Sequence, residues 1–455
     1  MKTSFLTAVV LFFGCNIQAQ VWLESTVIDT QVVAKNLEIP WEMEAWGSDT
    51  ILFTQRSGSI CRLSLISGQI DTMYLPDIAS DVFAAEGQSG MLGMQTHPDF
   101  PNTPYVYVAL TYYPDFSTSI RLAVLRLKYN AAADVLEKDS TIVSNIASAN
   151  TNIGGRLLIT SDNYLLLSVG DIKETGKPQD INSLNGKMLR YHLNGSIPNT
   201  NPIPNSPIFS LGHRNPQGIA EDNEGNIWIS EHGQSSNDEL NKLENGRNYG
   251  WPLVTGNCTS ASQSLCDSLN MAEPYETWSP TIAPAGLVYF NESSIPEWQN
   301  SLLIACLKEQ RIMVSHFNTD KSAVTHSDWV FQYQFGRIRD VLLMPNGRLF
   351  VCTSNRDVLG EPVAQDDIIM ELIPSQHNGI APSEKNTLTY QIQENNVLLS
   401  QNISGHAALF SIDGRLLQTI TLNQTNRIAL QPNRTFSPRI LRIETRDAAL
   451  TIKLL

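Results

Sequence analysis

The sequence predicts an all-β protein in which a six-bladed β-propeller is followed by a small C-terminal β-sandwich. A turn rich in Asp, Asn, Gly or Pro precedes a short apolar run six times, with roughly 47 to 75 residues between successive runs. No amphipathic stretch of helical length interrupts these repeats. Such units fit four-stranded blades with variable loops, and a pair of β-sandwiches is the alternative. The runs are Ile51–Phe53, Tyr105–Val108, Tyr164–Leu167, Ile227–Ile229, Leu302–Ile304 and Leu349–Val351.

The N-terminal residues 1–20 are typical of a signal peptide. Lys2 provides the positive start, Phe5–Phe13 form an apolar run, and small and polar residues follow around Ala19. This run is shorter than the roughly 20 apolar residues that a membrane-spanning helix needs, and no other segment is apolar enough for one. Lipid attachment at Cys15 is the alternative to cleavage. We therefore expect a secreted or cell-surface protein that is exported through the periplasm.

The remaining chain divides into a propeller over residues 21–375 and a separate domain over residues 376–455. A stretch rich in Pro, Ser, Gly and Asn begins near Ile373 and is suited to a linker. Short alternating strands follow it, and Asp413-Gly414 is a hairpin turn signal between two of them. A small all-β domain is the expected structure of this tail.

Three stretches of the tail resemble the C-terminal sorting domain of the type IX secretion system. They are Leu409–Arg415, Ile440–Glu444 and Thr451–Leu455. The resemblance implies that the tail addresses the protein to the type IX secretion machinery and takes no part in chemistry. A carbohydrate-binding or purely structural β-sandwich is the alternative.

Composition limits the classes of partner. Apolar residues make up 42% of the chain and charged residues 17%, so the chain can bury a large core. The formal net charge of -14 argues against a general affinity for nucleic acid or anionic membranes. Because export permits disulfides, Cys258 and Cys266 in a polar loop are expected to form one, whereas Cys61, Cys306 and Cys352 lie in apolar runs and are expected to be buried thiols.

Two basic residues in the last third of the propeller suggest an anion site. Arg337 and Arg339 are two positions apart, so on a strand both side chains point to the same face. Together with Lys308 and Arg214 they could converge at one mouth of an otherwise acidic protein. Guanidinium groups bind carboxylates bidentately, so this set suits a ligand with several carboxylates. Taken alone, such a pair of arginines is usually a solvated strand face.

A Gly-rich loop nearby offers hard oxygen ligands. Asp238 and Glu239 follow it and, with its backbone carbonyls, suit Ca²⁺. Taken alone, the two acids have the simpler reading of loop residues. The order in which these basic and acidic residues follow one another along the chain favours a functional site.

The strings Gly212–Gly218 and Asn248–Pro252 resemble the soluble pyrroloquinoline-quinone (PQQ) dependent glucose, aldose and sorbosone dehydrogenases over roughly residues 35 to 375. This resemblance implies a six-bladed propeller that holds PQQ over its axis and a Ca²⁺ ion that touches PQQ. The residues that it assigns to PQQ are Arg214, Asn215, Thr281, Lys308, Arg337 and Arg339. The resemblance assigns the backbone carbonyls of Gly233 and Gln234 to the calcium ion that touches PQQ, and it places a further structural Ca²⁺ near Glu239 and Tyr249. The chemistry of the loop adds Asp238 as a calcium ligand.

The resemblance does not extend to the family's catalytic base. In the family a histidine two positions before the Gly-Gly-Arg-Leu motif removes the proton while hydride passes to PQQ; here that position is Asn152. An amide has no basic lone pair for such work at neutral pH. Asp171 matches the aspartate that supports the histidine, and Gln88 matches a substrate-contacting glutamine, so catalysis would rest on Asn152, Asp171, Arg214 and Gln88.

Three functions are therefore compared. The first is a PQQ- and Ca²⁺-dependent oxidoreductase that oxidises an aldose or related polyol, either as a monomer or as a homodimer. The second is a non-catalytic secreted binding propeller of the same family, which Asn152 favours. The third is a calcium-dependent lactonase, whose chemistry does not require the Arg/Lys cluster.

Overall fold

The computed structural model describes residues 20–76, 82–114, 117–376, 390–393, 396–411, 416–430, 439–445 and 449–454. Contacts divide the chain into two compact units, Met1–Asn378 and Gly379–Leu455. Most of the expected signal peptide, with Cys15, lies outside the described residues. Among those that are described, no helix is long and apolar enough to cross a membrane.

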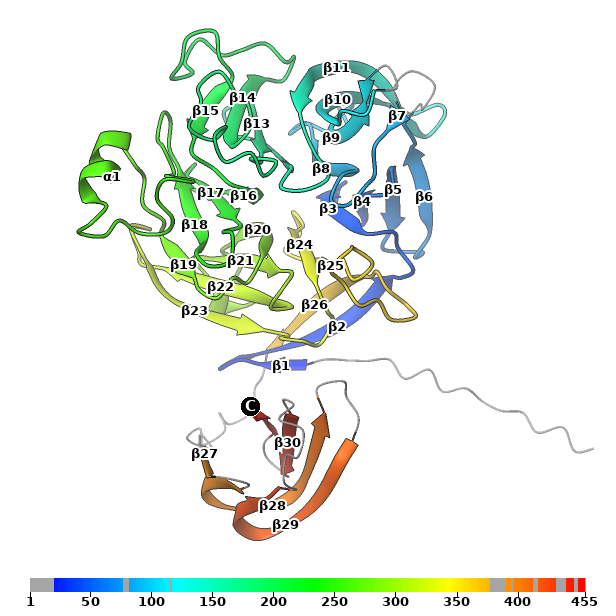
Figure 1. The fold of residues 1–455 in the computed structure, drawn as a ribbon. Helices are drawn as coiled ribbons and strands as arrows, with labels where there is room; N and C mark the ends of the chain where they lie inside the picture. Colours follow the sequence, from blue (N-terminus) through cyan, green and yellow to red (C-terminus); the bar gives the residue numbers. More distant parts are fainter. Residues whose placement is uncertain are drawn as a thin grey trace, which may run out of the picture. The chain divides into compact units, whose positions relative to one another are not determined.

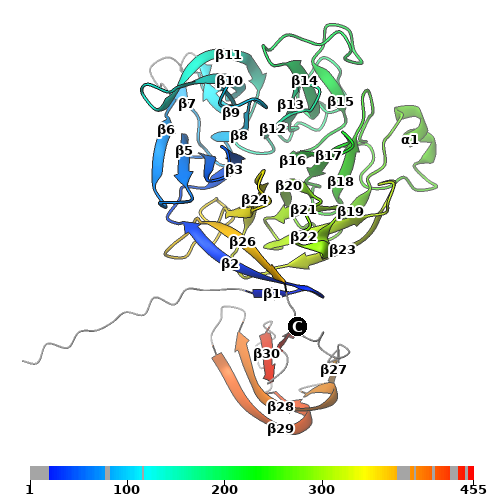
Figure 2. The ribbon, with the colours of Figure 1, turned by 180° about the vertical axis from the view of Figure 1, so that it is seen from behind.

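The first unit is built from antiparallel sheets arranged around a common centre (Figures 1 and 2). The first sheet contains β3 (Pro40–Ala45), β4 (Thr50–Gln55), β5 (Ser59–Ser64) and β6 (Ile70–Tyr74). The second contains β7 (Val82–Phe83), β8 (Met91–Thr96), β9 (Tyr105–Tyr113), β10 (Arg121–Asn130) and β11 (Val135–Ala147). The third contains β12 (Gly154–Ile159), β13 (Tyr164–Val169), β14 (Lys187–His192) and β15 (Ile208–Leu211).

Three more sheets complete the described part of this unit. The fourth contains β16 (Pro216–Glu221), β17 (Ile227–Glu231), β18 (Asp238–Leu243) and β19 (Glu276–Trp278). The fifth contains β20 (Pro284–Phe290), β21 (Ser301–Cys306), β22 (Arg311–Phe317) and β23 (Val324–Val330). The sixth contains β24 (Ile338–Leu343), β25 (Leu349–Thr353) and β26 (Ile369–Gln376), extended by β2 (Thr26–Ala34) and β1 (Gln20–Trp22).

The innermost strands form a closed circle. Successive strands β3, β8, β12, β16, β20 and β24 contact one another, and β24 contacts β3 again. The turn-and-run pattern of the sequence falls on the strand that pairs with the innermost strand of each sheet, namely β4, β9, β13, β17, β21 and β25. The structure is therefore the all-β propeller that the sequence predicts.

Apolar side chains fill the spaces between neighbouring sheets. Each cluster of buried residues in this unit, apart from a small one under the disulfide loop, joins neighbouring sheets of the circle. For example, Phe53 of the first sheet packs with Phe350 of the sixth. Cys61, Cys306 and Cys352 are buried free thiols in these clusters, as predicted. Strands need apolar residues on both faces here because each sheet is covered on both sides.

A strand near the N-terminus completes the sixth sheet. β2 pairs antiparallel with β26, with Thr26 opposite Gln376 and Ala34 opposite Ile369. Ile28 on β2 is fully buried among residues of the fifth and sixth sheets. The last sheet is thus assembled from the two ends of the first unit, a pairing that a strand-by-strand reading of the sequence did not include.

A polar loop carries the disulfide that the sequence predicts. Cys258 is bonded to Cys266, which lies in the short helix α1 (Gln263–Leu269). Cys266 and Met271 form a small cluster of their own beneath the loop. The covalent link orders a segment that has little other core.

The second unit is also all-β. Its strands β27 (Tyr390–Gln393), β28 (Asn396–Ser411), β29 (Leu416–Ala429), β30 (Arg439–Thr445) and β31 (Ala449–Leu454) are hydrogen-bonded into one sheet. Leu409, Leu422 and Ile443 belong to its buried core. The predicted hairpin turn at Asp413-Gly414 lies outside the described residues.

Candidate functional site

A cavity of about 390 Å³ opens where the sheets of the propeller meet. Every sheet of the first unit contributes to its wall, because the residues lie at the ends of the inner strands or in the loops beside them. The volume suits a small-molecule ligand or cofactor. The lining residues are Trp41, Arg56, Gln88, Leu92, Ile153, Gly154, Asn215, Gln217, His232, Ala283, Leu307, Lys308, Arg337, Arg339, Asp357, Val358 and Leu359.

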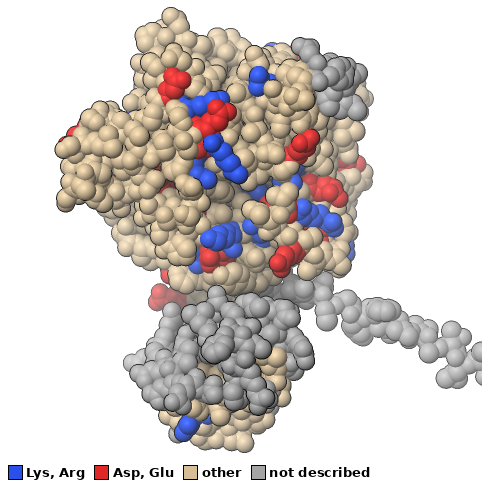
Figure 3. Space-filling view, in the orientation of Figure 1, with Lys and Arg blue, Asp and Glu red and all other residues tan. Residues whose placement is uncertain are grey.

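The cavity is cationic although the whole protein is acidic. Four of its side chains carry positive charge, Arg56, Lys308, Arg337 and Arg339, and one carboxylate, Asp357, opposes them. Figure 3 shows Lys and Arg interleaved with Asp and Glu on one face of the molecule, so the cationic excess belongs to the cavity and not to that whole surface. A concentration of positive charge in a cavity favours an anionic occupant.

Arg337 and Arg339 have unused hydrogen-bonding capacity. Each contacts Asp357 Oδ2 through Nη2 at 3.2 Å, and each has a buried Nε with no partner. Burial lowers the pKa of Arg339 to about 10, with Asp357 acting in the opposite direction. Buried donors without acceptors are costly, so these two guanidinium groups would gain from a ligand rich in carboxylate oxygens. This is the residue pair that the sequence predicts to share one face.

Of the other residues predicted to bind the cofactor, Lys308 and Asn215 line the cavity, whereas Thr281 and Arg214 do not. Lys308 lines it and donates from Nζ to Thr281 Oγ1 at 2.8 Å, which places Thr281 behind the lysine. Asn215 lines it and accepts at Oδ1 from Gly154 N at 3.2 Å. Arg214 is not a lining residue; it is turned toward the neighbouring loop.

Arg214 contacts the loop that is predicted to hold calcium. Its Nη1 donates to the carbonyl oxygens of His232 at 3.0 Å and Gly233 at 2.7 Å. Gly233 is one of the two predicted carbonyl ligands, with Gln234 the other. The guanidinium of Arg214 and the predicted ion would therefore share this carbonyl oxygen.

The acidic residues of the same region differ in their roles. Asp238 accepts at Oδ1 from Gly233 N and at Oδ2 from the Ile282 and Ala283 N–H groups, all at 2.7 Å. It therefore shapes the loop and places its carbonyls. Tyr249 is buried, donates its hydroxyl to Lys242 O at 2.6 Å and stacks on His213.

Glu239 lies in a setting that fits a divalent cation. Burial, reinforced by the nearby Glu231 carboxylate, raises the pKa of Glu239 to about 7. Asn241, which donates to Glu239 Oε2 at 3.0 Å, has a buried Oδ1 without a partner. Two close carboxylates and an unpaired amide oxygen form a donor set suited to Ca²⁺.

Asn152, at the position where the resemblance predicts a catalytic histidine, is hydrogen-bonded to Asp171. Asn152 Nδ2 donates to Asp171 Oδ1 at 2.9 Å, and Trp251 Nε1 donates to Asp171 Oδ2 at 2.9 Å. Gln88 lines the cavity and accepts from Asn152 N at 2.9 Å. Neither Asn152 nor Asp171 is among the lining residues, so the aspartate is shielded by the amide and by Trp251.

A buried ionic layer braces the inner strands next to the cavity. Arg156, from the Gly-Gly-Arg-Leu motif, pairs with Glu42 at 2.6 Å and Asp340 at 3.0 Å. Its guanidinium lies 4.2 Å from the ring centroid of Trp41, which lines the cavity. These contacts join β12 to β3 and β24 across the centre, and losing one partner would leave a buried charge unpaired.

Among the lining residues that the sequence analysis did not predict, three have titratable side chains: Arg56, His232 and Asp357. His232 donates from Nε2 to Pro284 O at 2.8 Å, and burial together with Arg339 and Arg214 lowers its pKa to about 3, so it is neutral. Arg56 and Asp357 also face the cavity. Each lies just beyond the end of a strand that precedes a loop, but that position by itself does not distinguish them from many other loop residues.

The fold and the cavity together define a β-propeller with a central cavity lined by cationic side chains. The chain matches the family described as Glucose / Sorbosone dehydrogenase over residues 37–359, and it belongs to that family. It is 31% identical over 432 residues to "Quinoprotein glucose dehydrogenase B" of Acinetobacter calcoaceticus, covering 76% of this chain and 88% of the relative. It is 28% identical to "Aldose sugar dehydrogenase YliI" of Escherichia coli, covering 74% and 93%.

A solved structure gives the same result for the fold. The PQQ-bound aldose sugar dehydrogenase of Streptomyces coelicolor matches with a TM-score of 0.67 and 28% identity, covering 78% of this chain and 99% of that protein. The resemblance on which the sequence analysis rested is therefore confirmed for the propeller. The resemblance of the tail to a sorting domain stays a prediction.

Proposed function

We propose that this protein is a PQQ- and calcium-dependent oxidoreductase that oxidises an aldose sugar or a related polyol. The observation that carries the proposal is the cavity wall with Arg56, Lys308, Arg337 and Arg339 against the single carboxylate of Asp357. PQQ is a tricarboxylate, and an excess of three positive charges matches it. Relatives described as a quinoprotein and as PQQ-bound support the same assignment.

The position of each residue in the cavity determines the role that we assign to it. Arg337, Arg339 and Lys308 would bind the carboxylates of PQQ, and Asn215 would orient it from the β16 side. PQQ, when bound, supplies the hydride acceptor. Ca²⁺ at the carbonyls of Gly233 and Gln234 would supply positive charge beside it. Gln88 would hold the sugar through its side-chain amide.

Asn152 limits the rate of such an enzyme. Its amide can hold a sugar hydroxyl by a hydrogen bond but cannot accept a proton at neutral pH. Asp171 is the remaining candidate base, acting directly or through water. The hydrogen bonds that Asn152 and Trp251 donate to its carboxylate must break before it can accept a proton from the substrate. The same observation favours the second candidate function, a secreted propeller that binds PQQ without efficient turnover.

Titration of the purified protein with PQQ in the presence of Ca²⁺, followed by absorbance and calorimetry, tests the proposal. We expect one equivalent to bind at micromolar PQQ or below, and chelation or Arg337→Ala to abolish binding. Thr325→Ala, on the outer strand β23, is a control expected to bind normally. If PQQ does not bind at micromolar concentration, the cavity is not a quinone site and the oxidoreductase proposal is wrong.

We also propose that the chain is exported with residues 1–20 as a signal peptide and residues 376–455 as a type IX sorting domain. The sequence pattern of both ends supports this. Comparing the cellular location of the full chain with that of a chain ending at Asn378 tests it. Retention of the shortened chain in the periplasm is the expected result, and unchanged export would contradict the role of the tail.

A further inference from the structure

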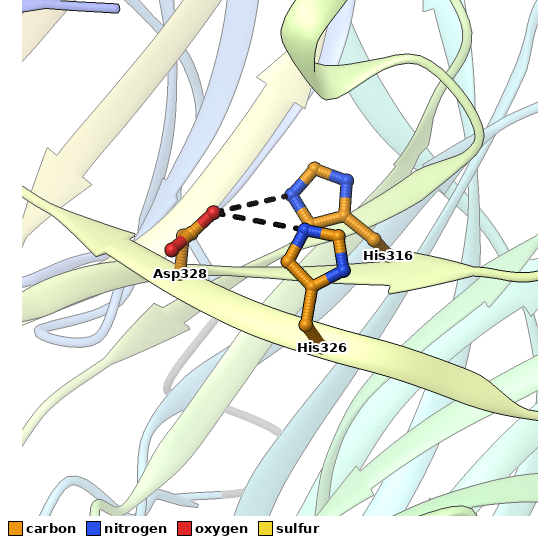
Figure 4. A group of neighbouring side chains, drawn as sticks. All are labelled: His316, His326 and Asp328. Carbon is orange, nitrogen blue, oxygen red and sulfur yellow. Dashed lines mark ion pairs between the residues drawn. The ribbon is translucent and has the colours of Figure 1, made fainter. Parts of the chain in front are cut away.

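Two histidines and an aspartate gather on the outer hairpin of the fifth sheet. His316 on β22 pairs directly with His326 on β23, and Asp328 lies two residues further along β23 on the same face. The imidazole rings are stacked, with centroids 4.3 Å apart and planes at 5°. Figure 4 shows that each ring turns a nitrogen toward the Asp328 carboxylate. No residue of β22 or β23 lines the cavity, so this group is separate from the site described above.

The distances suit a shared ion better than direct hydrogen bonds. Asp328 Oδ2 lies 3.8 Å from His316 Nε2 and 3.9 Å from His326 Nε2. Hydrogen bonds between such atoms would be about 2.7–3.2 Å long. An ion with ligand bonds of about 2.0–2.2 Å places two ligand atoms up to about 4.4 Å apart. The three ligand atoms lie within 4.8 Å of one another, so slight rotation of the exposed side chains would bring them onto one ion.

A threonine sets the tautomer of one histidine. Thr325 Oγ1 lies 3.2 Å from His316 O and 3.0 Å from His326 Nδ1. Because a carbonyl can only accept, the Thr325 hydroxyl donates to His316 O, and its oxygen then accepts from His326 Nδ1–H. That leaves the lone pair of His326 on Nε2, the atom that faces Asp328. A ligating histidine whose other nitrogen donates to an oxygen is the usual arrangement at metal sites.

We propose that His316, His326 and Asp328 form a binding site for one divalent transition-metal ion of the Zn²⁺ or Cu²⁺ type. Two imidazoles and a carboxylate select such ions, whereas Ca²⁺ prefers oxygen ligands alone. His316 is largely buried, with 12% of its side chain exposed, while His326 and Asp328 are 60% and 71% exposed. The ion would therefore have one anchored ligand and an outward position open to water. Bound there, it would fasten the outermost strand β23 to β22.

Calorimetric titration of the full, untagged protein with Zn²⁺, after chelation and with Ca²⁺ in excess, tests the site. We expect one equivalent to bind, with affinity reduced about tenfold or more in His326→Gln and in Asp328→Asn. His97→Gln is the matched control. His97 lies in a turn with Asp99, far in the sequence from the proposed site, so this variant should bind Zn²⁺ as the unaltered protein does. If His326→Gln and Asp328→Asn bind Zn²⁺ normally, the proposal is wrong.

A second measurement isolates the role of Thr325. Thr325→Val removes the acceptor for His326 Nδ1–H and should weaken Zn²⁺ binding by about 10- to 100-fold, and Thr325→Ser should restore it. With Cu²⁺ as the probe, electron paramagnetic resonance should show coupling to two imidazole nitrogens, and to one in His326→Gln. A spectrum without nitrogen coupling in the unaltered protein would overturn the site independently of any effect on folding.

Discussion

At position 152 an amide occupies the place where the family resemblance puts a basic imidazole. The backbone there has a positive φ of 48°, a conformation that Asn and His both tolerate better than most residues. The side chain keeps its bond to Asp171, so the local hydrogen bonding survives while the proton acceptor is lost. The amide therefore lacks the basicity that the resemblance predicts for this position.

Asn152→His should restore that property. We expect the rate of sugar oxidation with PQQ and Ca²⁺ to rise about 10²- to 10⁴-fold, because a positioned general base contributes a factor of this size. Steady-state kinetics over a panel of aldoses measures it, with PQQ affinity determined in parallel. Asn152→Gln is the control, since it keeps an amide. No gain with normal PQQ affinity would indicate a remodelled binding propeller.

Glu44 provides a second test at the residue scale. Burial raises its pKa to about 8, while its oxygens accept from Gln95 Nε2 at 2.6 Å and Thr96 Oγ1 at 3.3 Å. A carboxyl whose pKa is raised on folding favours the folded state less as pH rises from about 4.5 to about 8, because the native state then binds more protons than the unfolded state. Glu44→Gln should remove this contribution. The free energy of unfolding of the variant, relative to the unaltered protein, should rise by roughly 3–4 kcal/mol between pH 5 and 8. A pH-independent difference in urea unfolding would contradict it.

At the scale of elements, the strand that precedes the first repeat completes the last sheet. β2 contributes Ile28 to the core between the fifth and sixth sheets, and its hydrogen bonds to β26 run almost the length of both strands. β2 covers the outer edge of β26, which could otherwise pair with other chains. The stability of the propeller therefore depends on residues far from the site.

Ile28→Ala should destabilise the protein by about 2–5 kcal/mol, because it leaves a cavity in a fully buried position. Val32→Ala, on the same strand with 43% of the residue exposed, should change the free energy of unfolding by no more than about 0.5 kcal/mol. Urea denaturation of both variants makes the comparison. Equal effects would mean that β2 is not a part of the cooperative core.

At the scale of the whole molecule, the chain separates into two units with their own cores. A chain ending at Asn378 should keep the thermal midpoint of the propeller and bind PQQ with an affinity within about twofold of the full chain. Calorimetry on both forms checks this, with Arg337→Ala in the shortened chain as the control for specific binding. Loss of PQQ affinity on shortening would show that the tail contributes to the site.

The sequence by itself determined the propeller class, the blade-sized repeats, the disulfide and the face shared by Arg337 and Arg339. These depend on local signals: turn residues, apolar runs, cysteine spacing and strand periodicity act within a few residues of one another. The motif strings placed the family, and the family placed most of the candidate site residues.

Only the tertiary structure decided which of those residues face the cavity. Arg214 turns to the carbonyl of Gly233, and Asp238 shapes a loop, while Arg56, Asp357 and His232 join the wall. The pairing of β2 with β26 and the meeting of His316 with Asp328 also arise from contacts between strands. Side-chain direction and long-range pairing depend on the closing of the ring, which no local pattern in the sequence encodes.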